Sequence, residues 1–388
     1  MVQSLAAYAG ETTIRAFLDV LEEQCAAYCI LGRCDELPFR VHSDIDFMVS
    51  REDYPRLPQI LQMLARRTGF EIVRERRHEM TGHRYDLALA KNGKISYLSP
   101  DACSDYRRHG RCWLRADQVL AHRRRHSNGF WIPSAADQFL YYLIKRLEKQ
   151  SLEDVHTEEL RRLFAEDPDG CARALDKRLT HASARLIAAA AQTGDWQTVQ
   201  VNSRTLFQEF LSSASSDSLT WRLMGNPLRL ARLWLRPTGL WVAFCGTPNT
   251  APLCAEQYAD ALQVLFRGAQ HFHAGPTFPD GPDSIGHPSP RPLRAWIGSV
   301  LAYLSRIRPA LTRSALAVTE CGAFRTTSVP SKQPGSFARL LAAITPKPEL
   351  VFTPDLSTAP ETAMQDYLSR TLALLARRAA RALHLNSH

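Results

Sequence analysis

The chain has 388 residues, 45% of them hydrophobic and 22% charged, and its 48 Lys and Arg residues outnumber its 39 Asp and Glu residues, giving a formal net charge of +9 at pH 7. This composition is typical of a soluble globular protein, and the length predicts two or three domains. No apolar run approaches the roughly 20 residues that a membrane helix needs, and the N-terminal segment lacks the basic start of an export signal, so we expect a cytoplasmic protein without a membrane span.

The cysteine pattern and the basic charge indicate which metal sites and ligands the chain is expected to have. Nine cysteines are scattered along the chain without a CxxC pair, which argues against a disulfide framework or a structural zinc site. The positive charge suits anionic partners, namely nucleotides, nucleic acid or an acidic membrane surface. A solvated basic face without a ligand is the alternative, and no sequence module that reads DNA or RNA accompanies the charge.

The first part of the chain alternates helix and strand. Apolar residues at helical spacing predict two helices, the second of which ends at Gly69, where a C-terminal glycine is expected. Asn92 and Gly93 are typical of the turn of a β-hairpin. The expected helices cover residues 11–27 and 53–69, and the expected strands cover residues 28–32, 45–50, 70–78 and 83–99.

Only helices are expected after this part. Ser134 has the side chain of an N-cap, and Phe139, Leu143 and Leu147 lie on one face of the helix that follows it. The helical pattern continues until Arg236, Pro237 and the residues after them interrupt it. We therefore expect an α/β domain over residues 1–133, a helical extension of it over residues 134–236 and a separate domain over residues 237–388.

The last domain again alternates strand and helix, which implies a parallel sheet covered by helices. Residues 275–292 are rich in proline and poor in apolar residues, which predicts an exposed loop or a disordered lid. The apolar stripe of the long C-terminal helix is expected to pack on its own domain. The expected strands cover residues 240–244, 269–273, 315–320 and 349–354, and the expected helices cover residues 255–266, 293–306, 337–344 and 363–383.

The strongest chemical signal is a pair of acids in the first part. Asp44 and Asp46 lie two residues apart at the start of an expected strand, so their side chains project from the same face. Two parallel carboxylates repel each other unless a cation lies between them, and Mg²⁺, which prefers oxygen ligands and substrate phosphates, suits this position. Asp86, at the start of a later strand, is the expected third carboxylate. Three carboxylates around one or two Mg²⁺ ions can hold a triphosphate and activate an attacking hydroxyl.

These residues resemble the nucleotidyltransferase superfamily, whose members carry a glycine-ended strand, a D-x-D pair and a third acid on a later strand. The resemblance assigns Gly32 to the glycine. It implies that Asp44, Asp46 and Asp86 are the metal ligands and catalytic residues, with Asp86 as the general base toward the acceptor hydroxyl. It also implies Mg²⁺ or Mn²⁺ and an NTP as cofactor and substrate.

Four further residues complete the expected nucleotide site. Arg33 follows the glycine where the family usually has serine, and an arginine can also contact phosphate. Ser43 directly precedes the D-x-D pair. Lys145 and Lys149 lie one turn apart on a helix whose lysines reach nucleotide phosphates in relatives. The alternatives are that both lysines are solvated and that the D-x-D acids cap a turn and pair with nearby arginines.

The last domain resembles thymidylate kinase-like P-loop proteins in the order of its elements, over nearly its whole length. Its phosphate loop departs from the pattern G-x-x-x-x-G-K-[ST]. Gly246, Ala251, Pro252 and Leu253 stand at the first glycine, the second glycine, the lysine and the hydroxyl residue. Pro252 also removes a backbone N–H from the phosphate cradle. We therefore expect a degenerate kinase-like domain without kinase activity.

Two functions from different classes follow. In the first, the N-terminal domain transfers a nucleotidyl group to an unidentified acceptor, and the kinase-like domain serves as a scaffold for the acceptor or for a protein partner. In the second, neither domain is catalytic and the protein is a binding or regulatory scaffold. Proteins that resemble this pair of domains accompany bacterial polysaccharide assembly, which is the setting that the resemblance implies. Modification of an RNA end is a third hypothesis, which rests on the basic charge alone.

Overall fold

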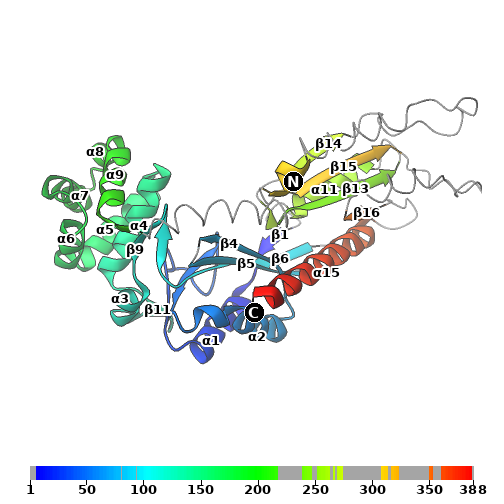
Figure 1. Cartoon of the computed structure of the whole chain (residues 1–388), viewed down its shortest axis with the longest axis horizontal. Coiled ribbons are helices and arrows are strands. Elements are labelled where there is room, and N and C mark those ends of the chain that lie inside the picture. Colours follow the sequence, from blue (N-terminus) through cyan, green and yellow to red (C-terminus); the bar gives the residue numbers. More distant parts are fainter. Residues whose placement is uncertain are drawn as a thin grey trace, which may run out of the picture. The chain divides into compact units, whose positions relative to one another are not determined.

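A computed structural model describes residues 6–79, 81–92, 94–216, 238–246, 251–262, 265–266, 269–273, 307–312, 316–322, 349–352 and 360–386 (Figure 1). The chain divides into two compact units. The N-terminal unit comprises Tyr8–Leu87, Leu98–Gly225 and Arg378–His388, and the C-terminal unit comprises Met1–Ala7, Ala88–Tyr97 and Asn226–Arg377. The expected domain boundaries after residues 133 and 236 stay predictions, and the second of them lies outside the described residues. No described helix is long and apolar enough to cross a bilayer.

A mixed seven-stranded sheet has the strand order β1-β6-β5-β7-β3-β2, and β4 also pairs with β5. β3 pairs parallel with β7 and antiparallel with β2, while β5 pairs antiparallel with β7. Together with its helices, this sheet makes the fold mixed α/β, as expected. The strands are β1 Ala6–Tyr8, β2 Tyr28–Ile30, β3 Ile45–Val49, β4 Glu71–Glu79, β5 Gly82–Lys91, β6 Lys94–Leu98 and β7 Pro100–Cys103.

The short strand β7 is the one element of this sheet, apart from the edge strand β1, that the sequence did not predict. It has four residues, begins with Pro100 and contains Asp101, a composition that is typical of a loop. β7 nevertheless lies between β5 and β3 in the centre of the sheet. Its position there decides which side chains lie beside the D-x-D pair.

Two helices pack side by side on one face of the sheet (Figure 1). The first, α1 (Glu11–Gln24), places Phe17 edge-on to Phe47 of β3, with 5.4 Å between the ring centroids. The second, α2 (Leu57–Thr68), follows the short 3₁₀ helix η1 (Tyr54–Arg56) and ends at Gly69, whose φ of 75° suits glycine. The D-x-D acids lie on the other face of β3, because side chains alternate along a strand.

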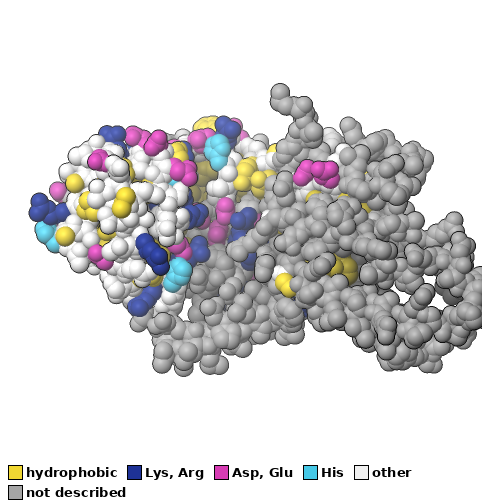
Figure 2. All heavy atoms as spheres, turned by 90° about the horizontal axis from the view of Figure 1, so that it is seen from above, with side chains coloured by type: hydrophobic (Ala, Val, Ile, Leu, Met, Phe, Trp, Pro, Cys, Tyr) yellow, Lys and Arg dark blue, Asp and Glu magenta, His cyan; other side chains and the backbone are white. Residues whose placement is uncertain are grey.

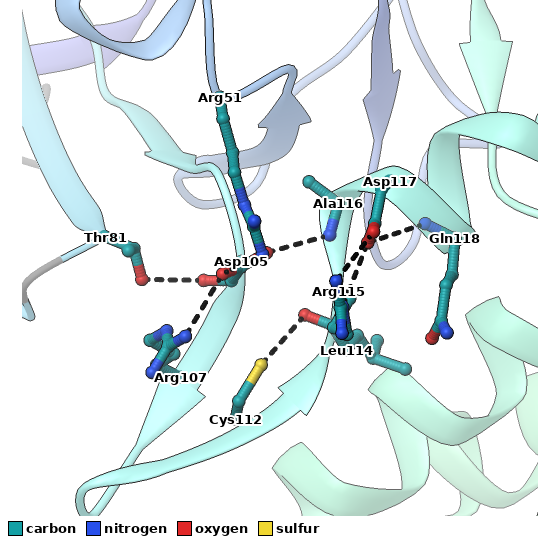
Figure 3. Close-up of polar contacts among 10 residues, drawn as sticks. All are labelled: Arg51, Thr81, Asp105, Arg107, Cys112, Leu114, Arg115, Ala116, Asp117 and Gln118. Carbon is teal, nitrogen blue, oxygen red and sulfur yellow. Dashed lines mark hydrogen bonds and ion pairs between the residues drawn. The ribbon is translucent and has the colours of Figure 1, made fainter. Parts of the chain in front are cut away.

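A buried carboxylate fixes the segment that follows β7. Asp105 accepts hydrogen bonds from Arg51 and Arg107 and from the backbone N–H of Ala116, while its backbone carbonyl accepts one from Thr81 (Figure 3). The residue is 3% exposed. Three separate segments, around Arg51, Thr81 and Ala116, are thereby tied to the residues that follow β7, the strand that carries Asp101. After Asp105 the chain continues into β8 (Tyr106–Arg108), β9 (Arg111–Leu114) and α3 (Ala116–Ala121). The short strand β12 (Ser215–Ser216) pairs with β9.

The helical part begins at Ser134, whose hydroxyl accepts a hydrogen bond from the backbone N–H of Asp137, so the predicted N-cap is confirmed. The long helix α4 packs against α5, α6 and α9. Phe139, Leu143 and Leu147 of α4 are fully buried among them. The helices are α4 Ala135–Lys149, α5 Asp154–Glu166, α6 Pro168–Asp176, α7 His181–Thr193, α8 Gln197–Val201 and α9 Ser203–Ser213, and the short strands β10 Arg124–Arg125 and β11 Trp131–Ile132 precede them.

The C-terminal unit contains a parallel four-stranded sheet in the order β14-β15-β13-β16, so the predicted parallel pairing is confirmed. The predicted packing of the C-terminal helix on its own domain is confirmed for the part that contains Thr371, which forms a 2.6 Å hydrogen bond with Tyr258, whereas the last residues of the helix belong to the N-terminal unit. The predicted helices at 293–306 and 337–344 and the loop at 275–292 lie outside the described residues. The elements are β13 Leu240–Gly246, α11 Ala251–Leu262, β14 Ala269–His273, α13 Arg308–Thr312, β15 Leu316–Gly322, β16 Leu350–Phe352 and α15 Pro360–Asn386.

Candidate functional site

Strand register places three charged residues in a row across the centre of the sheet. Asp46 of β3 is the pairing partner of Asp101 of β7, and Asp101 is in turn the partner of Arg84 of β5. Paired residues on neighbouring strands point to the same face and lie next to each other. The row therefore reads carboxylate, carboxylate, guanidinium across three adjacent strands.

The surroundings of Asp101 disfavour the charged form of its carboxylate. Burial and the neighbouring carboxylates of Asp46 and Asp44 raise its pKa from 3.8 to about 7, against the opposing effect of Lys145 and Arg84. The register of β3 and β7 brings Asp101 beside Asp46, and like charges at this spacing repel each other. Asp101 was not among the acids predicted from the sequence, and the assignment of Asp44 and Asp46 as metal ligands stays a prediction.

Each acid of the D-x-D pair already has a cationic partner. Arg84 donates a hydrogen bond from Nη1 to Asp44 Oδ2 at 2.9 Å, and Lys145 donates one from Nζ to Asp46 Oδ2 at 2.5 Å. Within the described ranges, no three Asp, Glu, His or Cys side chains are arranged so that they could hold a metal ion as they stand. The two acids are therefore brought together by the fold but neutralised by side chains of the protein itself.

Asp86, which the sequence analysis assigned as the third carboxylate, lies apart from this row. Its side chain is fully buried and is bound at 2.7 Å by Arg74, at 3.0 Å by Arg84 and at 2.7 Å by the hydroxyl of Ser99. Burial alone would raise the pKa of Asp86, but the two guanidinium groups and the Ser99 hydrogen bond hold it below its usual range. Because both its oxygens are occupied and inaccessible, Asp86 has the environment of a structural ion pair.

Gly32, the glycine that the resemblance to nucleotidyltransferases assigned to the site, lies next to Asp46. Gly32 has a φ of 76°, a backbone conformation that other residues adopt only with strain. A Cβ atom at this position would lie 3.7 Å from the Tyr141 ring and 3.9 Å from Asp46 Oδ2. The carbonyl of Gly32 accepts a hydrogen bond from the side chain of Gln138, which is 2% exposed. Gln138, Tyr141 and Lys145 lie on one face of α4, so a single helix holds both the glycine turn and Asp46.

The remaining predicted nucleotide-binding residues surround this centre. Arg33 and Ser43 are exposed on the loop between β2 and β3, and the Ser43 hydroxyl donates a 3.3 Å hydrogen bond to the carbonyl of Asp44. Lys149 has its pKa lowered by burial and by the neighbouring charges of Lys145 and Arg146. Arg33 and Lys149 form no ion pair with any residue that the structure describes. Lys149 interacts electrostatically with Asp46 and Asp44, and Arg33 directly follows Gly32, so both cations suit an anionic ligand at this site.

A hydrogen-bonded group on α4 and α5 adjoins these cations. Arg146 donates to His156 Nε2 at 2.7 Å, and His156 Nδ1 lies 2.8 Å from the Tyr142 hydroxyl. Burial first, and then the positive charges of Arg146, Arg33 and Lys149, lower the pKa of His156. Because arginine can only donate, His156 Nε2 accepts, and the ring is neutral with its proton on Nδ1. The positive potential of this region is therefore carried by Arg33, Arg146 and Lys149.

The predicted degenerate phosphate loop lies in the C-terminal unit. Gly246 is the last residue of β13, and Ala251, Pro252 and Leu253 open α11. The loop between them lies outside the described residues. The residues at the predicted lysine and hydroxyl positions are Pro252 and Leu253, and the assignment of a phosphate loop stays a prediction.

The sequence did not predict three residues of the site: Asp101, Arg84 and Gln138. Asp101 alternates with the buried residues Pro100 and Ala102, which is a weak period-2 signal over only four residues. Arg84 precedes Asp86 by two residues on the same strand, so the same alternation that indicated Asp86 could have indicated Arg84. Gln138 has no sequence signal, because its role depends on its distance from Gly32.

On the face of the molecule seen in Figure 2, the described Lys and Arg side chains are interspersed with Asp and Glu. They do not gather into one basic surface on that face. The net charge of +9 is therefore not concentrated in the part of the described surface that this view shows.

The chain was compared with family models, with curated proteins and with solved structures. No family model and no curated protein matches the chain. Two solved structures do: a candidate nucleotidyltransferase from Helicobacter pylori and the protein JHP933 from the same organism. Each shows 12% identity and a TM-score of 0.25, and the similarity covers 52% of this chain and 95% and 92%, respectively, of the two relatives. A TM-score of 0.25 is too low to support a conclusion about fold or function.

Proposed function

We propose that the N-terminal unit is a metal-dependent nucleotidyltransferase, which transfers a nucleotidyl group from an NTP to an unidentified acceptor. The observation that carries the proposal is the register of β3 and β7, which places Asp101 beside Asp46, with Asp44 two residues away on the same face. Three carboxylates that repel one another are a donor set that suits a hard divalent cation. Asp101 thereby takes the role that the resemblance gave to Asp86.

The side chains of the site divide between two tasks in this proposal. Asp44, Asp46 and Asp101 would hold Mg²⁺ or Mn²⁺, which supplies positive charge against the triphosphate and polarises its reacting phosphorus. Gly32, Arg33 and Ser43 border the space where the triphosphate would lie, together with Lys145 and Lys149. Arg33 and Lys149 can bind phosphate without first leaving a carboxylate.

Nucleotide binding tests this function directly. Thermal unfolding of the full chain is measured with each NTP, with and without Mg²⁺ or Mn²⁺. We expect a metal-dependent stabilisation in the wild type that is lost in Asp44→Asn and in Asp101→Asn, since each removes one donor. Asp117→Asn is the matched control, because Asp117 is an exposed aspartate whose carboxylate binds Arg115. Equal stabilisation in all four proteins would refute the proposed site.

A second candidate is a non-catalytic binding protein, and one observation favours it. Asp44 and Asp46 are neutralised by Arg84 and Lys145 without any metal ion. Under this alternative no nucleotide stabilises the protein with either metal. The thermal unfolding experiment therefore separates the two functions.

For the C-terminal unit we propose a degenerate thymidylate kinase-like domain that positions a protein partner or the acceptor. The parallel strand order β14-β15-β13-β16 and the residues Ala251, Pro252 and Leu253 support this proposal. Without the lysine and the hydroxyl, the domain lacks the main groups that stabilise phosphoryl transfer. The link to bacterial polysaccharide assembly rests on the resemblance of the domain pair. Stabilisation by an NTP that persists in Asp44→Asn would place nucleotide binding outside the N-terminal acids and count against a purely scaffolding domain.

A further inference from the structure

Arg84 is bound by three groups at once. Its Nη1 donates to Asp44 at 2.9 Å, its Nε to Asp86 at 3.0 Å and its Nη2 to the Ser99 hydroxyl at 3.2 Å. The side chain is 18% exposed. One guanidinium group therefore joins an acid of the candidate metal site to the structural acid on the neighbouring part of the sheet.

Loss of the Arg84 contact would affect Asp44 and Asp86 differently. Asp86 keeps Arg74 and Ser99 as partners when Arg84 moves. Asp44 has Arg84 as its cationic partner, and its side chain is 36% exposed, so the carboxylate can be reached from solvent. A turn of the guanidinium plane about the Cδ–Nε bond would break the Nη1 bond to Asp44 and the Nη2 bond to Ser99. It would free Asp44 and leave the Nε bond to Asp86 in place.

Arg84 and Lys145 are not equivalent as cations at this site. Lys145 holds Asp46 through one ammonium group on a flexible side chain, whereas Arg84 is held at three points and its guanidinium group stays charged at every pH that a protein tolerates. A divalent ion at Asp44 and Asp101 would therefore meet the permanent charge of Arg84, which is in register with Asp101. The positive charge must move aside or the ion is repelled.

We propose that Arg84 competes with the divalent cation for Asp44, and that nucleotide phosphates release it by offering the guanidinium another acceptor. This inference rests on the proposed function. It makes metal binding weak in the protein alone and strong when an NTP is present, because the phosphates and the metal ion favour the same released position of Arg84. Arg84 is then a positioning residue that couples the two ligands.

Manganese binding to the full chain tests this coupling without any measurement of activity. Free Mn²⁺ is titrated by electron paramagnetic resonance with the wild type, Arg84→Gln and Arg51→Gln. Arg51 is the matched control, because it also pairs with a buried aspartate, Asp105, at 3.1 Å. Without nucleotide, we expect Arg84→Gln to bind Mn²⁺ about tenfold tighter than the wild type, within the usual range of coupling between ligands, and Arg51→Gln to match the wild type.

The nucleotide arm uses a non-hydrolysable ATP analogue. We expect the analogue to tighten Mn²⁺ binding in the wild type more than in Arg84→Gln, because the variant has no guanidinium to release. A second variant, Arg84→Met, is measured alongside, so that a folding defect peculiar to one substitution does not decide the result; in both variants Asp86 keeps Arg74 and Ser99 as partners. Arg84→Met is expected to bind Mn²⁺ as tightly as Arg84→Gln.

The outcomes separate this inference from the function on which it rests. Equal or weaker Mn²⁺ binding in both Arg84 variants, with nucleotide-dependent binding intact in the wild type, overturns the competition and leaves the nucleotidyltransferase standing. No Mn²⁺ binding by any of the proteins, even with the analogue, overturns both. Tighter binding in Arg51→Gln as well would show a general effect of charge and also overturn the role of Arg84.

Discussion

Replacing Asp86 with asparagine should destabilise the fold and keep NTP binding, whereas replacing Asp101 should keep stability and abolish NTP binding. Comparing the two variants shows which acid is structural. Asp86 is fully buried and is held by Arg74 at 2.7 Å, Arg84 at 3.0 Å and Ser99 at 2.7 Å. Asparagine leaves both guanidinium groups facing a neutral amide in a buried position. Removing one partner of such a pair costs about 3–5 kcal/mol, which is a large fraction of the roughly 5–15 kcal/mol that stabilises a domain.

Asp101→Asn should leave stability unchanged or increase it. Its carboxylate is level with Asp46 on the neighbouring strand, and burial together with the charges of Asp46 and Asp44 raises its pKa to about 7. Asparagine removes both the buried charge and the repulsion without changing the size of the side chain. The same variant should lose metal-dependent NTP binding, which Asp86→Asn should keep at temperatures where it is folded.

Urea unfolding followed by tryptophan fluorescence, together with NTP binding in the presence of Mg²⁺, measures both effects. The reasoning fails if Asp86→Asn unfolds within about 1 kcal/mol of the wild type, well below the cost of breaking a buried ion pair, and loses NTP binding. It fails equally if Asp101→Asn binds NTP normally. Either result would return Asp86 to the role that the sequence resemblance implied.

Three further predictions concern the scaffold around the site. Burial and Arg77 lower the pKa of His83 from 6.5 to about 4, so the unfolded chain binds the extra proton more tightly and stability falls as the pH drops below 6.5. Between pH 7 and pH 5 the wild type should lose about 2 kcal/mol more unfolding free energy than His83→Gln. Equal losses in the two proteins, measured by urea unfolding, would contradict this. Asp105→Ala should lower the unfolding free energy by about 3–5 kcal/mol, because Arg51, Arg107 and the N–H of Ala116 lose their acceptor. Replacement of the exposed Asp117 with alanine should cost less than about 1 kcal/mol in the same assay. Equal costs would show that the Asp105 contacts do not stabilise the fold. Ser134→Ala should cost about 1 kcal/mol by removing the N-cap of α4, and a thermal midpoint identical to the wild type would show that this cap is dispensable.

Local chemistry explains what the sequence predicted correctly. Alternation along β3 put Asp44 and Asp46 on one face, a hydroxyl before an apolar helical pattern located the start of α4 at Ser134, and a glycine located the end of α2 at Gly69. Each of these features depends on a few consecutive residues. The same holds for the parallel sheet of the C-terminal unit, whose strands are short apolar runs separated by helical patterns.

The identity of the third carboxylate depends instead on strand pairing. Asp86 and Asp101 both lie on strands of the same sheet, and their local sequences do not reveal which strand pairs with β3. β7 takes that position and brings Asp101 level with Asp46, while β5 lies one strand further away and brings Arg84, rather than Asp86, level with Asp101. The sequence by itself thus determined the D-x-D pair and the elements around it. Only the tertiary structure decided its neighbours, because pairing and register join residues that are far apart in the chain.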